Sequence, residues 1–355
     1  MPENLSRPPL RIAVVATPWF PIPPSGYGGI EAMVHSLVEG MVARGHEVVL
    51  VGAGAHRSGA TFLQTYDRPP IERIGEAFPE VVHALVAAEH LADLDVDVVH
   101  DHSLAGPLTS GWRQAPTVVT VHGPVVGEIG TCWRVLSRYT GLVAISDGQR
   151  VNGPDLPWMG RVYNAIPVDQ YPFEGQKEDF CLFLGRVSPE KAPDLAIRAA
   201  RAAGFPIVVA AKCNEPAEQR YFQERVRPLL GPDAEWFGEA STTQKKELLA
   251  RARCLVFPIQ WDEPFGIVMV EAMACGTPVV ALNRGSVPEV VVDGVTGFIC
   301  QEPEELPDAI RRVDQLDPKA CRRRVFDCFD VEDMIDGYEG VYRQMLERAG
   351  SGGPA

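Results

Sequence analysis

Two glutamates eight residues apart, Glu263 and Glu271, are the strongest chemical signal in the sequence. The run EPFGIVMVEAMACGTPVVA predicts a strand-to-helix turn between them, and eight helical residues rise about 12 Å. That length is similar to the reach from a sugar ring to the ribose in a nucleotide sugar, and carboxylates accept hydrogen bonds from paired hydroxyls. Glu271 lies among apolar residues, where an unpaired carboxylate is unfavourable. We therefore expect both carboxylates to bind ligand hydroxyls, rather than to be ordinary glutamates on an exposed helix.

A glycine and a helix start lie between the two glutamates. Gly266 allows the backbone to approach a ligand closely. The free amides of Phe265, Gly266 and Ile267 at the helix N-terminus suit a phosphate or another polar group. We expect these three residues to bind the same ligand as the glutamates.

Two cations form the second motif. In the run FLGRVSPEKAPDL, Arg186 and Lys191 follow a predicted strand and open a helix, so two positive charges and a helix N-terminus converge. Arginine binds phosphate bidentately and lysine binds it as a point charge, which gives the pair the outline of a diphosphate clamp. Basic residues near helix starts are also common on surfaces, and the clamp is favoured because the glutamate pair accompanies it.

Glycines after predicted strands form a weaker signal. Gly28 and Gly29 precede a helix in the run PSGYGGIE, where their amides could approach a phosphate; a plain tight turn is the alternative. The run lacks the GxGxxG spacing of dinucleotide-binding proteins. Gly238 lies in another loop after a strand, which we expect to frame a nucleotide base.

Histidines raise the question of a metal centre, because all eight lie at or before position 122. His100 and His102 are adjacent but one, yet no acidic or cysteine partner has metal-site spacing. We expect no metal, and a structural or surface role for His100. His122 ends a strand and is the candidate for a functional histidine. The pair Asp95 and Asp97 mimics the DxD of metal-dependent transferases, but it lies at a helix-to-strand junction and is expected to have no such role.

The elements that position these residues alternate between short β-branched runs and longer helical segments, which is typical of doubly wound parallel sheets. The alternation restarts after the Pro-rich interval 162–172. We expect domains at 1–170 and 171–330, and a last helix in 331–355 that crosses back to the first domain. Two such sheets facing each other form a ligand cleft at their carboxyl edges. Strands are expected at 11–16, 47–52, 96–100, 117–122 and 142–145, then at 180–184, 206–211, 234–237, 253–258, 278–281 and 296–300.

Composition restricts the class of partner. The 355 residues carry 33 Lys+Arg against 47 Asp+Glu, a net charge of −14, whereas nucleic-acid and anionic-membrane binding need basic faces. We expect no nucleic-acid partner and at most peripheral membrane contact. No run approaches the roughly 18 apolar residues of a spanning helix, and no signal-peptide pattern opens the sequence. Eight cysteines without a CxxC pair indicate reduced thiols, so we expect a cytoplasmic protein.

At these motifs the sequence resembles the retaining glycosyltransferases of family 4, which have the GT-B fold of two Rossmann-like domains facing across a cleft. The glutamate run looks like that family's E-x7-E signature, and GRVSPEK looks like its G-R-x4-K element. The resemblance continues through 285–291 and 293–298 and is looser between about 55 and 175. Gly285-Ser286 stands where the family often has two glycines, a departure that removes no charged residue.

The resemblance implies a role for each candidate. Glu263 would contact the hydroxyls of the donor sugar and Glu271 the nucleotide ribose. Arg186 and Lys191 would clamp the diphosphate, and His122 would contact the sugar near the reacting centre. The loop with Gly28 and Gly29 would close over the diphosphate.

The expected function is therefore retaining transfer from a nucleotide-diphosphate sugar, UDP before GDP or dTDP, to a hydroxyl of a saccharide, lipid or secondary metabolite. No cofactor or essential metal is expected. Oligosaccharide-antibiotic and cell-envelope glycan biosynthesis are both open, as is the oligomeric state. The alternatives are a non-catalytic nucleotide-sugar binding protein and another GT-B activity such as a phosphorylase.

Overall fold

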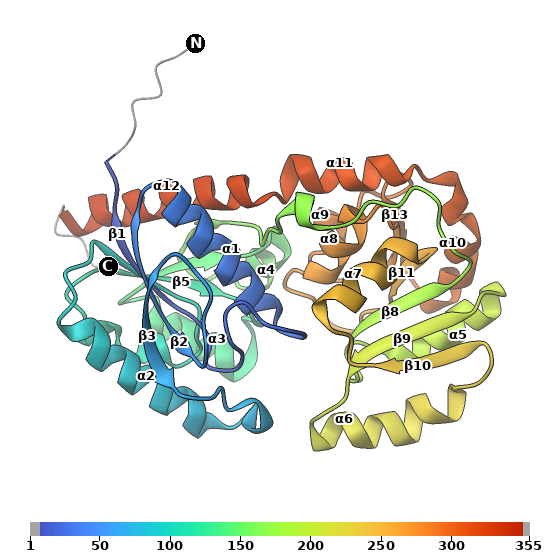
Figure 1. Ribbon diagram of the computed structural model, residues 1–355, viewed down its shortest axis with the longest axis horizontal. Helices are drawn as coiled ribbons and strands as arrows, with labels where there is room; N and C mark the ends of the chain where they lie inside the picture. Colours follow the sequence, from blue (N-terminus) through green and yellow to red (C-terminus); the bar gives the residue numbers. More distant parts are fainter. Residues whose placement is uncertain (1–7, 351–355) are drawn as a thin grey trace, which may run out of the picture.

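The computed structural model describes residues 8–350 and shows two α/β lobes side by side (Figure 1). Each lobe is built on one parallel sheet, seven-stranded in the first lobe and six-stranded in the second. Buried runs such as IAVV at 12–15 form the central strands, because a parallel sheet with helices on both faces leaves neither side of a strand in water. The expected pair of doubly wound parallel sheets is confirmed.

The first sheet has the strand order β3-β2-β1-β4-β5-β6-β7. Strand order reverses between β1 and β4, and such a reversal opens a crevice at the carboxyl ends of the strands. The strands are β1 (Arg11–Val15), β2 (Glu47–Ala53), β3 (Thr61–Tyr66), β4 (Val98–Asp101), β5 (Thr117–Val121), β6 (Gly141–Ala144) and β7 (Trp158–Arg161). The helices are α1 (Gly29–Ala43), α2 (Ala77–Ala92), α3 (Gly127–Leu136) and α4 (Asp147–Asn152), with a 3₁₀ helix at Gly106–Trp112.

The second sheet has the order β10-β9-β8-β11-β12-β13, with the same reversal between β8 and β11. Its strands are β8 (Cys181–Arg186), β9 (Ile207–Lys212), β10 (Ala234–Gly238), β11 (Cys254–Phe257), β12 (Val279–Leu282) and β13 (Gly297–Cys300). Its helices are α5 (Pro193–Ala203), α6 (Pro216–Tyr221), α7 (Thr242–Arg251), α8 (Ile267–Ala274), α9 (Val287–Val290), α10 (Leu306–Arg312) and α11 (Pro318–Cys328).

Successive residues of a strand supply opposite faces of each sheet, as the two-residue period of a strand requires. In β1, Ile12 and Val14 pack with α1, whereas Ala13 and Val15 pack with α2. In β8, Leu182 faces α7, α8 and α11 while its neighbours face α5 and α10. Each lobe therefore has two apolar layers, and its sheet is held rigidly between them.

The last helix, α12 (Val331–Gly350), leaves the second lobe and lies along the first, next to α1 (Figure 1). Its apolar face joins the core under β1, β2, β4 and β5, and Tyr338 and Tyr342 are completely buried there. Arg44, the residue that follows α1, pairs with Glu332 and Asp336 of α12. The chain thus connects the lobes twice, once near residues 162–180 and once through α12.

Two strands, β3 and β7, were not among the predicted ones. Both lie at the edges of the first sheet, where strands are partly exposed and the continuous apolar signal is lost. The sequence also favours a helix over 217–229, which the structure divides into α6, a π-helical turn at Phe222–Val226 and a 3₁₀ turn. It favours another helix over 189–203, but α5 begins only at Pro193 because 188–192 form a turn.

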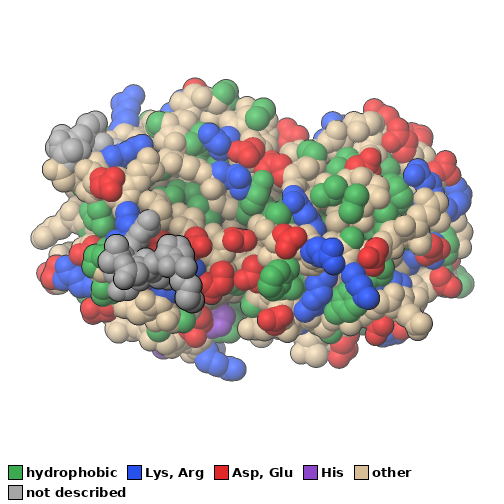
Figure 2. Space-filling view, turned by 90° about the horizontal axis from the view of Figure 1, so that it is seen from above, with side chains coloured by type: hydrophobic (Ala, Val, Ile, Leu, Met, Phe, Trp, Pro, Cys, Tyr) green, Lys and Arg blue, Asp and Glu red, His purple; other side chains and the backbone are tan. Residues whose placement is uncertain are grey.

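No helix within residues 8–350 is both long and apolar enough to cross a membrane. The face seen from above carries acidic and basic side chains side by side, with apolar groups between them (Figure 2).

Candidate active site

A cleft of about 450 Å³ lies between the lobes, at the carboxyl ends of both sheets. Loops that follow β1, β5 and β6 form one wall, and loops that follow β8, β9, β10 and β11 form the other. Ten of the eleven predicted site residues line it: Arg186, Lys191, Glu263, His122, Gly28, Gly29, Phe265, Gly266, Ile267 and Glu271. The structure therefore assembles residues that are up to 243 positions apart in the sequence into one cavity.

Glu263 is buried in this cleft and is held by two donors on one of its oxygens. The Lys191 ammonium and the indole Nε1 of Trp261, the latter at 3.0 Å, both reach Oε2. Oε1 has no hydrogen-bond partner within residues 8–350. The carboxylate is thus fixed in orientation while one oxygen remains available to ligand hydroxyls.

The backbone at Glu263 is also fixed. Its carbonyl accepts the amide of Ser286 at 2.9 Å. Gly285 has a φ of +54°, and a Cβ on it would lie 2.3 Å from the Glu263 carbonyl oxygen. Only glycine fits this approach, so the segment at 285–286 supports the first signature glutamate from behind.

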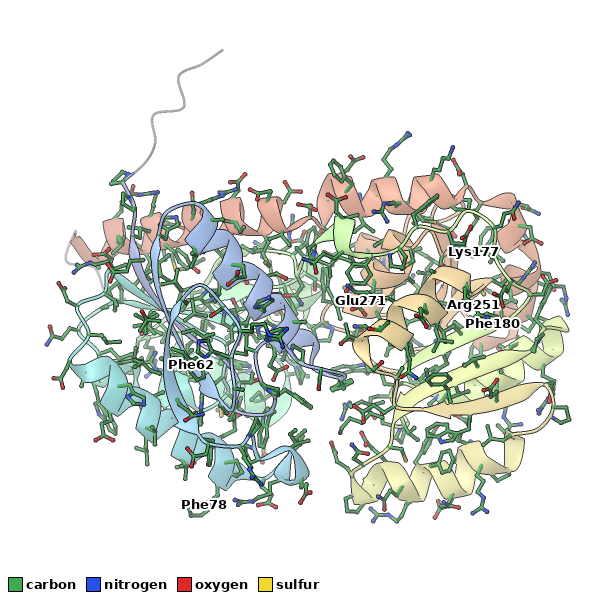
Figure 3. The ribbon with its side chains drawn as sticks, in the orientation of Figure 1. Phe62, Phe78, Lys177, Phe180, Arg251 and Glu271 are labelled. Carbon is green, nitrogen blue, oxygen red and sulfur yellow. The ribbon has the colours of Figure 1, made fainter. Side chains whose placement is uncertain are left out.

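Glu271 is held in the same manner at the other end of the motif. The Tyr171 hydroxyl donates to Oε1 at 2.9 Å, and the Lys245 ammonium pairs with the same oxygen. Oε2 has no hydrogen-bond partner among the described residues. Burial and the neighbouring carboxylate raise the pKa of Tyr171. Glu271 lies on the side of the second lobe that faces the first (Figure 3), so its unpartnered oxygen belongs to the cleft wall.

The start of α8 lies between these carboxylates. Gly266 is the N-cap, with a φ of +72°, and a Cβ there would lie 2.7 Å from the methyl of Met269. A side chain at this position is therefore excluded both by conformation and by space. The residues Phe265, Gly266, Ile267 and Val268 at the start of α8 line the cleft, and amides at a helix N-terminus suit a polar ligand.

The predicted clamp residues lie next to each other on the same wall. Arg186 ends β8, where its guanidinium is 3.2 Å from Glu190 and 3.8 Å from Glu218. Lys191 follows in the turn before α5. The next residue, Ala192, has a φ of +51°, the one positive value for a non-glycine among the described residues. Strain of this kind persists only where the surrounding contacts enforce it, and here it fixes the turn that carries Lys191.

A third cation, Lys212, ends β9 directly beside Arg186 in the strand register. Its side chain is buried, with its ammonium 3.1 Å from Glu215 and 3.7 Å from Glu218. The nearby ring of Tyr27 comes from the first lobe, with its centroid 5.8 Å from the ammonium. Burial raises the pKa of Tyr27 to about 12, so it stays a neutral phenol. Two cations, each beside carboxylates, therefore lie next to each other at these strand ends of the second lobe.

The glycine loop of the first lobe reaches across the cleft to the second (Figure 1). The Ser25 carbonyl accepts the amide of Thr242 at 3.3 Å. A Cβ on Gly29 would lie 3.3 Å from Ile267, so the backbone passes close to α8. Gly28 has a φ of +138° and would clash with Pro24 if it carried a side chain. The loop therefore closes one end of the cavity and brings the two lobes into contact there.

His122 lies at the end of β5, where Gln149 donates to the carbonyls on either side of it, at Val121 (2.8 Å) and Gly123 (2.9 Å). Its Nε2 is 2.9 Å from Nδ1 of His102. Burial lowers the pKa of His122 to about 3, so the ring is neutral at physiological pH. Of the structural and surface positions expected for His100, the structure shows an interior one, since its side chain is completely buried and hydrogen-bonded to Tyr342 and Thr120.

Gly238 is the predicted site residue that does not line the cleft. It ends β10, and the following residues Glu239 and Ala240 line the cavity in its place. Asp95 and Asp97 do not line the cleft and pair with Arg11. The described residues contain no group of three histidine, cysteine or acidic side chains arranged to hold a metal ion.

Several residues in the cleft wall or behind it were missed by sequence reasoning. Lys245 and Trp261 line the cleft and Tyr171 lies behind it; all three hold Glu263 or Glu271, yet each comes from a different segment and carries no motif of its own. Glu31 was missed as well. It lines the cleft, and burial raises its pKa to about 7. The rarity of lysine was a usable signal, because three of only six lysines in the chain line this cavity.

Comparison with known proteins agrees with this arrangement. The family model "Glycosyl transferases group 1" matches residues 169–324, and "Glycosyltransferase Family 4" matches residues 27–152, so most of the chain is covered, one model on each lobe. The paired sheets, the cleft and these matches define a glycosyltransferase with the GT-B fold. Within that class, the chain belongs to glycosyltransferase family 4.

Individual relatives resemble the chain over nearly its whole length. It is 28% identical to the glycogen synthase of Mycobacterium tuberculosis (strain CDC 1551 / Oshkosh), with 94% of each chain covered. AviGT4, a glycosyltransferase involved in avilamycin A biosynthesis, matches with a TM-score of 0.74 at 27% identity, covering 96% of this chain and 98% of that one. Anabaena Alr3699/HepE in complex with UDP and glucose shares the fold, with a TM-score of 0.73 at 18% identity over 94% and 100% of the two chains.

Proposed function

We propose that this glycosyltransferase uses a nucleotide-diphosphate sugar, with UDP preferred, and retains the configuration of the transferred sugar. The observation that carries the proposal is the arrangement of Glu263 and Glu271, each held by a lysine on one oxygen and open on the other, beside Arg186. This arrangement suits a ligand with hydroxyls at both ends and negative charge between them. The UDP in the complex of Alr3699/HepE supports the choice of base.

Different residues of the cleft bind different parts of the donor. Glu263 accepts hydrogen bonds from the sugar hydroxyls, and Glu271 accepts them from the ribose. Arg186, Lys191 and the amides at Gly28 and Gly29 bind the diphosphate. Phe265, Gly266 and Ile267 add backbone donors at the start of α8, where a helix terminus favours anionic or polar groups.

The chemical step breaks the bond between the anomeric carbon and the diphosphate oxygen and forms a bond from that carbon to the acceptor oxygen. Negative charge builds on the leaving diphosphate, and preorganised cations stabilise it. We propose that the acceptor attacks from the face of the leaving group and that the departing phosphate oxygen takes the acceptor proton. Closure of the lobes, which already touch through the glycine loop, excludes water that would hydrolyse the donor.

The acceptor is a hydroxyl of a saccharide, a lipid or a secondary metabolite bound on the first-lobe side, and we place the reaction in the cytoplasm. The role of AviGT4 in avilamycin A biosynthesis supports an oligosaccharide-antibiotic pathway as the first to test. Cell-envelope glycans are the second.

A donor screen tests this function. The protein is incubated with UDP-, GDP- and dTDP-sugars and with acceptor extracts, and release of nucleoside diphosphate is measured with and without a chelator. We expect acceptor-dependent release that is largest for UDP and persists with the chelator, and a product with the anomeric configuration of the donor. Tight donor binding without release would identify a binding protein instead, and a requirement for inorganic phosphate would identify a phosphorylase.

A matched pair of variants tests the site. Glu263→Gln keeps the shape of the side chain but removes its charge, so we expect transfer to fall strongly. Glu235→Gln changes an exposed glutamate of the same lobe on β10 and should leave transfer unchanged. Equal activity of the two variants would remove Glu263 from the site.

A further inference from the structure

Glu289 belongs to the second lobe, yet among the described residues its side chain forms hydrogen bonds only outside that lobe. It lies in α9, a single turn close to α4 at the place where the lobes meet (Figure 1). Its Oε2 accepts the amide of Asp147 at 2.7 Å, and its Oε1 accepts the amide of Gly148 at 2.5 Å. Both amides belong to the first turn of α4. A carboxylate of one lobe therefore satisfies the free amides of a helix in the other.

The rest of Glu289 is fixed as well. Its amide donates to the Ser286 carbonyl at 2.9 Å, and its carbonyl accepts the Arg324 guanidinium of α11 at 2.6 Å. A third donor, the Tyr163 hydroxyl, reaches Oε2 at 3.0 Å. Burial raises the pKa of Tyr163 to about 12, so its phenol keeps its proton at physiological pH. Hydrogen bonds to an ionised acceptor are stronger than neutral ones, so three of them hold this carboxylate in one orientation.

Tyr163 joins this contact to the two connections between the lobes. It lies in the first connection, and its ring centroid is 5.2 Å from that of Phe329, which precedes α12 in the second. The connections are also joined directly, because the Ile166 amide donates to the Phe329 carbonyl at 3.1 Å. The bonds of Glu289 therefore lie where the lobes pivot, and they restrain the placement of one lobe relative to the other.

The first lobe comes close to the back of the donor site at the same contact. A Cβ on Gly148 would lie 2.9 Å from the carbonyl carbon and oxygen of Gly285. Gly285 in turn passes so close to Glu263 that a Cβ on it would lie 2.3 Å from the Glu263 carbonyl oxygen. The next residue, Ser286, donates its amide to that carbonyl. A single layer of backbone, at 285–286, therefore separates the start of α4 from Glu263.

We propose that Glu289 is a positioning residue that holds the first lobe against the segment 285–286 and thereby fixes Glu263 relative to the first-lobe wall of the cleft. The inference deepens the function proposed above and rests on Glu263 being part of the donor site. Glu289 does not line the cleft and touches no ligand in this scheme. It acts through the placement of the lobes, which sets the distance between the sugar on one wall and the acceptor on the other.

The contact itself is tested first, by hydrogen exchange of the full-length protein resolved to single amides by NMR. The first amides of a helix exchange rapidly unless a group outside the helix accepts them. We expect the amides of Asp147 and Gly148 to be protected in the unliganded protein. Glu289→Gln offers one acceptor oxygen in place of two, so at least one amide should lose protection about 10-fold, the effect of losing a hydrogen bond to a charged group. Rapid exchange of both amides in the wild-type protein would overturn the proposal.

Two variants then disturb the contact from opposite sides. Glu289→Gln removes the charge from the second lobe, whereas Gly148→Ala places a methyl against Gly285 from the first lobe and leaves Glu289 intact. The matched controls are Glu235→Gln, an exposed glutamate of the second lobe, and Gly340→Ala, an exposed position of α12 with nothing within 4 Å of the added Cβ.

Both contact variants should impair transfer more than nucleotide binding. We expect kcat to fall about 10- to 100-fold, because a displacement of ~1 Å at the reacting groups can cost about 100-fold in rate. The affinity for UDP, measured by calorimetry, should change much less, since UDP carries no sugar for Glu263 to bind. A larger fraction of the donor should be hydrolysed, because imperfect closure admits water. Both controls should retain wild-type values, and thermal unfolding verifies that each variant is folded.

The outcomes separate this proposal from the function on which it rests. Lower thermal stability with unchanged kcat and an unchanged hydrolysed fraction would make Glu289 a helix cap alone and overturn the proposal. A loss of kcat in Glu289→Gln that folded Gly148→Ala does not share would also overturn it, as would a UDP affinity that falls as strongly as kcat. Protection that is lost as expected, in a protein that neither binds nor releases UDP, would refute the proposed function and leave Glu289 as the residue that places the lobes.

Discussion

The two lobes carry different titratable chemistry. All eight histidines lie at or before position 122, in the first lobe, and all six lysines lie at or after position 177, in the second. On the first-lobe wall of the cleft the histidine is neutral because burial lowers its pKa to about 3. On the second-lobe wall Lys191, Lys212 and Lys245 keep their carboxylate partners within the same cavity.

This difference shows how a transferase of this fold separates two tasks. Cations paired with carboxylates supply the charged donors that the proposed diphosphate ligand needs. Neutral imidazoles in a dry interior supply directed N–H groups and acceptors without adding charge. The comparison therefore predicts that pH acts chiefly on the first lobe, whereas charge removal acts chiefly on the second.

The largest effect is expected from acid. Burial lowers the pKa values of His100 and His122 to about 3 and of His83 to about 4, whereas the unfolded chain binds these protons near pH 6.5. The unfolded state therefore holds more protons below pH 6.5, and each ring removes about 1.4 kcal/mol of stability per pH unit as pH falls toward 4. Burial raises the pKa of Glu31 to about 7, so the folded state binds this proton more readily than the unfolded state. Protonation of Glu31 below pH 7 therefore adds stability and offsets the loss caused by one of the histidines.

Hydrogen exchange resolved by peptide measures this loss in each lobe. Between pH 7.5 and 5, we expect the opening free energies of β1, β4 and β5 to fall by several kcal/mol and those of β8, β11 and β12 to change much less. A parallel loss in both lobes would break the comparison.

Removal of one second-lobe cation is the next largest effect. Arg186→Ala should lower kcat by about 10²- to 10³-fold, the loss typical of one preorganised donor at a developing charge. Arg201→Ala is the matched control, because Arg201 pairs with Asp233 on the outer surface of the same lobe. Transfer assays on both variants check this, and near-wild-type turnover in Arg186→Ala would contradict the role of the second-lobe field.

A smaller effect should come from the backbone behind Glu263. Gly285→Ala combines a strained φ of +54° with a Cβ placed 2.3 Å from the Glu263 carbonyl oxygen. Gly294→Ala has a comparable φ of +71° but meets nothing within 4 Å. Both variants should lose about 1–3 kcal/mol of folding stability from strain. Only Gly285→Ala should also raise the donor KM, because only that change displaces Glu263. Calorimetry measures the loss of stability, and donor titration measures KM. An equal rise in the donor KM of both variants would mean that backbone strain, not the displacement of Glu263, causes the effect.

The smallest effect compares two buried tyrosines. Tyr342→Phe leaves Nδ1 of His100 without its partner in the first lobe and should lower stability by about 1–2 kcal/mol without changing the donor KM. Tyr171→Phe leaves Glu271 still paired with Lys245, so its stability loss should be smaller while its donor KM rises. The reverse pattern in unfolding and binding measurements would show that the two lobes do not divide their tasks in this way.

The sequence predicted those parts of the fold that depend on local pattern. Apolar runs such as IAVV at 12–15 and the glycines before α1 and α8 located the central strands and the loops after them, because these features are read within a few residues. The edge strands β3 and β7 were not predicted, because their partly exposed positions carry polar and apolar residues together and not a continuous apolar run. Arg186, Lys191, Glu263 and Glu271 could be predicted as site residues because each stands in a short motif next to a predicted strand or helix start.

The rest of the site depends on contacts that no local pattern encodes. Tyr171 meets Glu271 across 100 positions of sequence, and His102 meets His122 across 20 positions through the pairing of β4 with β5. Neither Tyr171 nor His102 stands in a motif, and only the folded chain brings each of them to its partner. Gly238 is a residue that the sequence placed in the site and the structure does not. The next two residues, Glu239 and Ala240, line the cleft instead.

The return of α12 has a consequence for the order of events during synthesis. The second lobe is continuous in sequence from β8 to α11, so it can fold as soon as that stretch has left the ribosome. The first lobe begins earlier but must wait for Tyr338 and Tyr342 to fill its core and engage His100. The part of the protein that is made first is therefore completed last, and until then it exposes the groove in which α12 will lie.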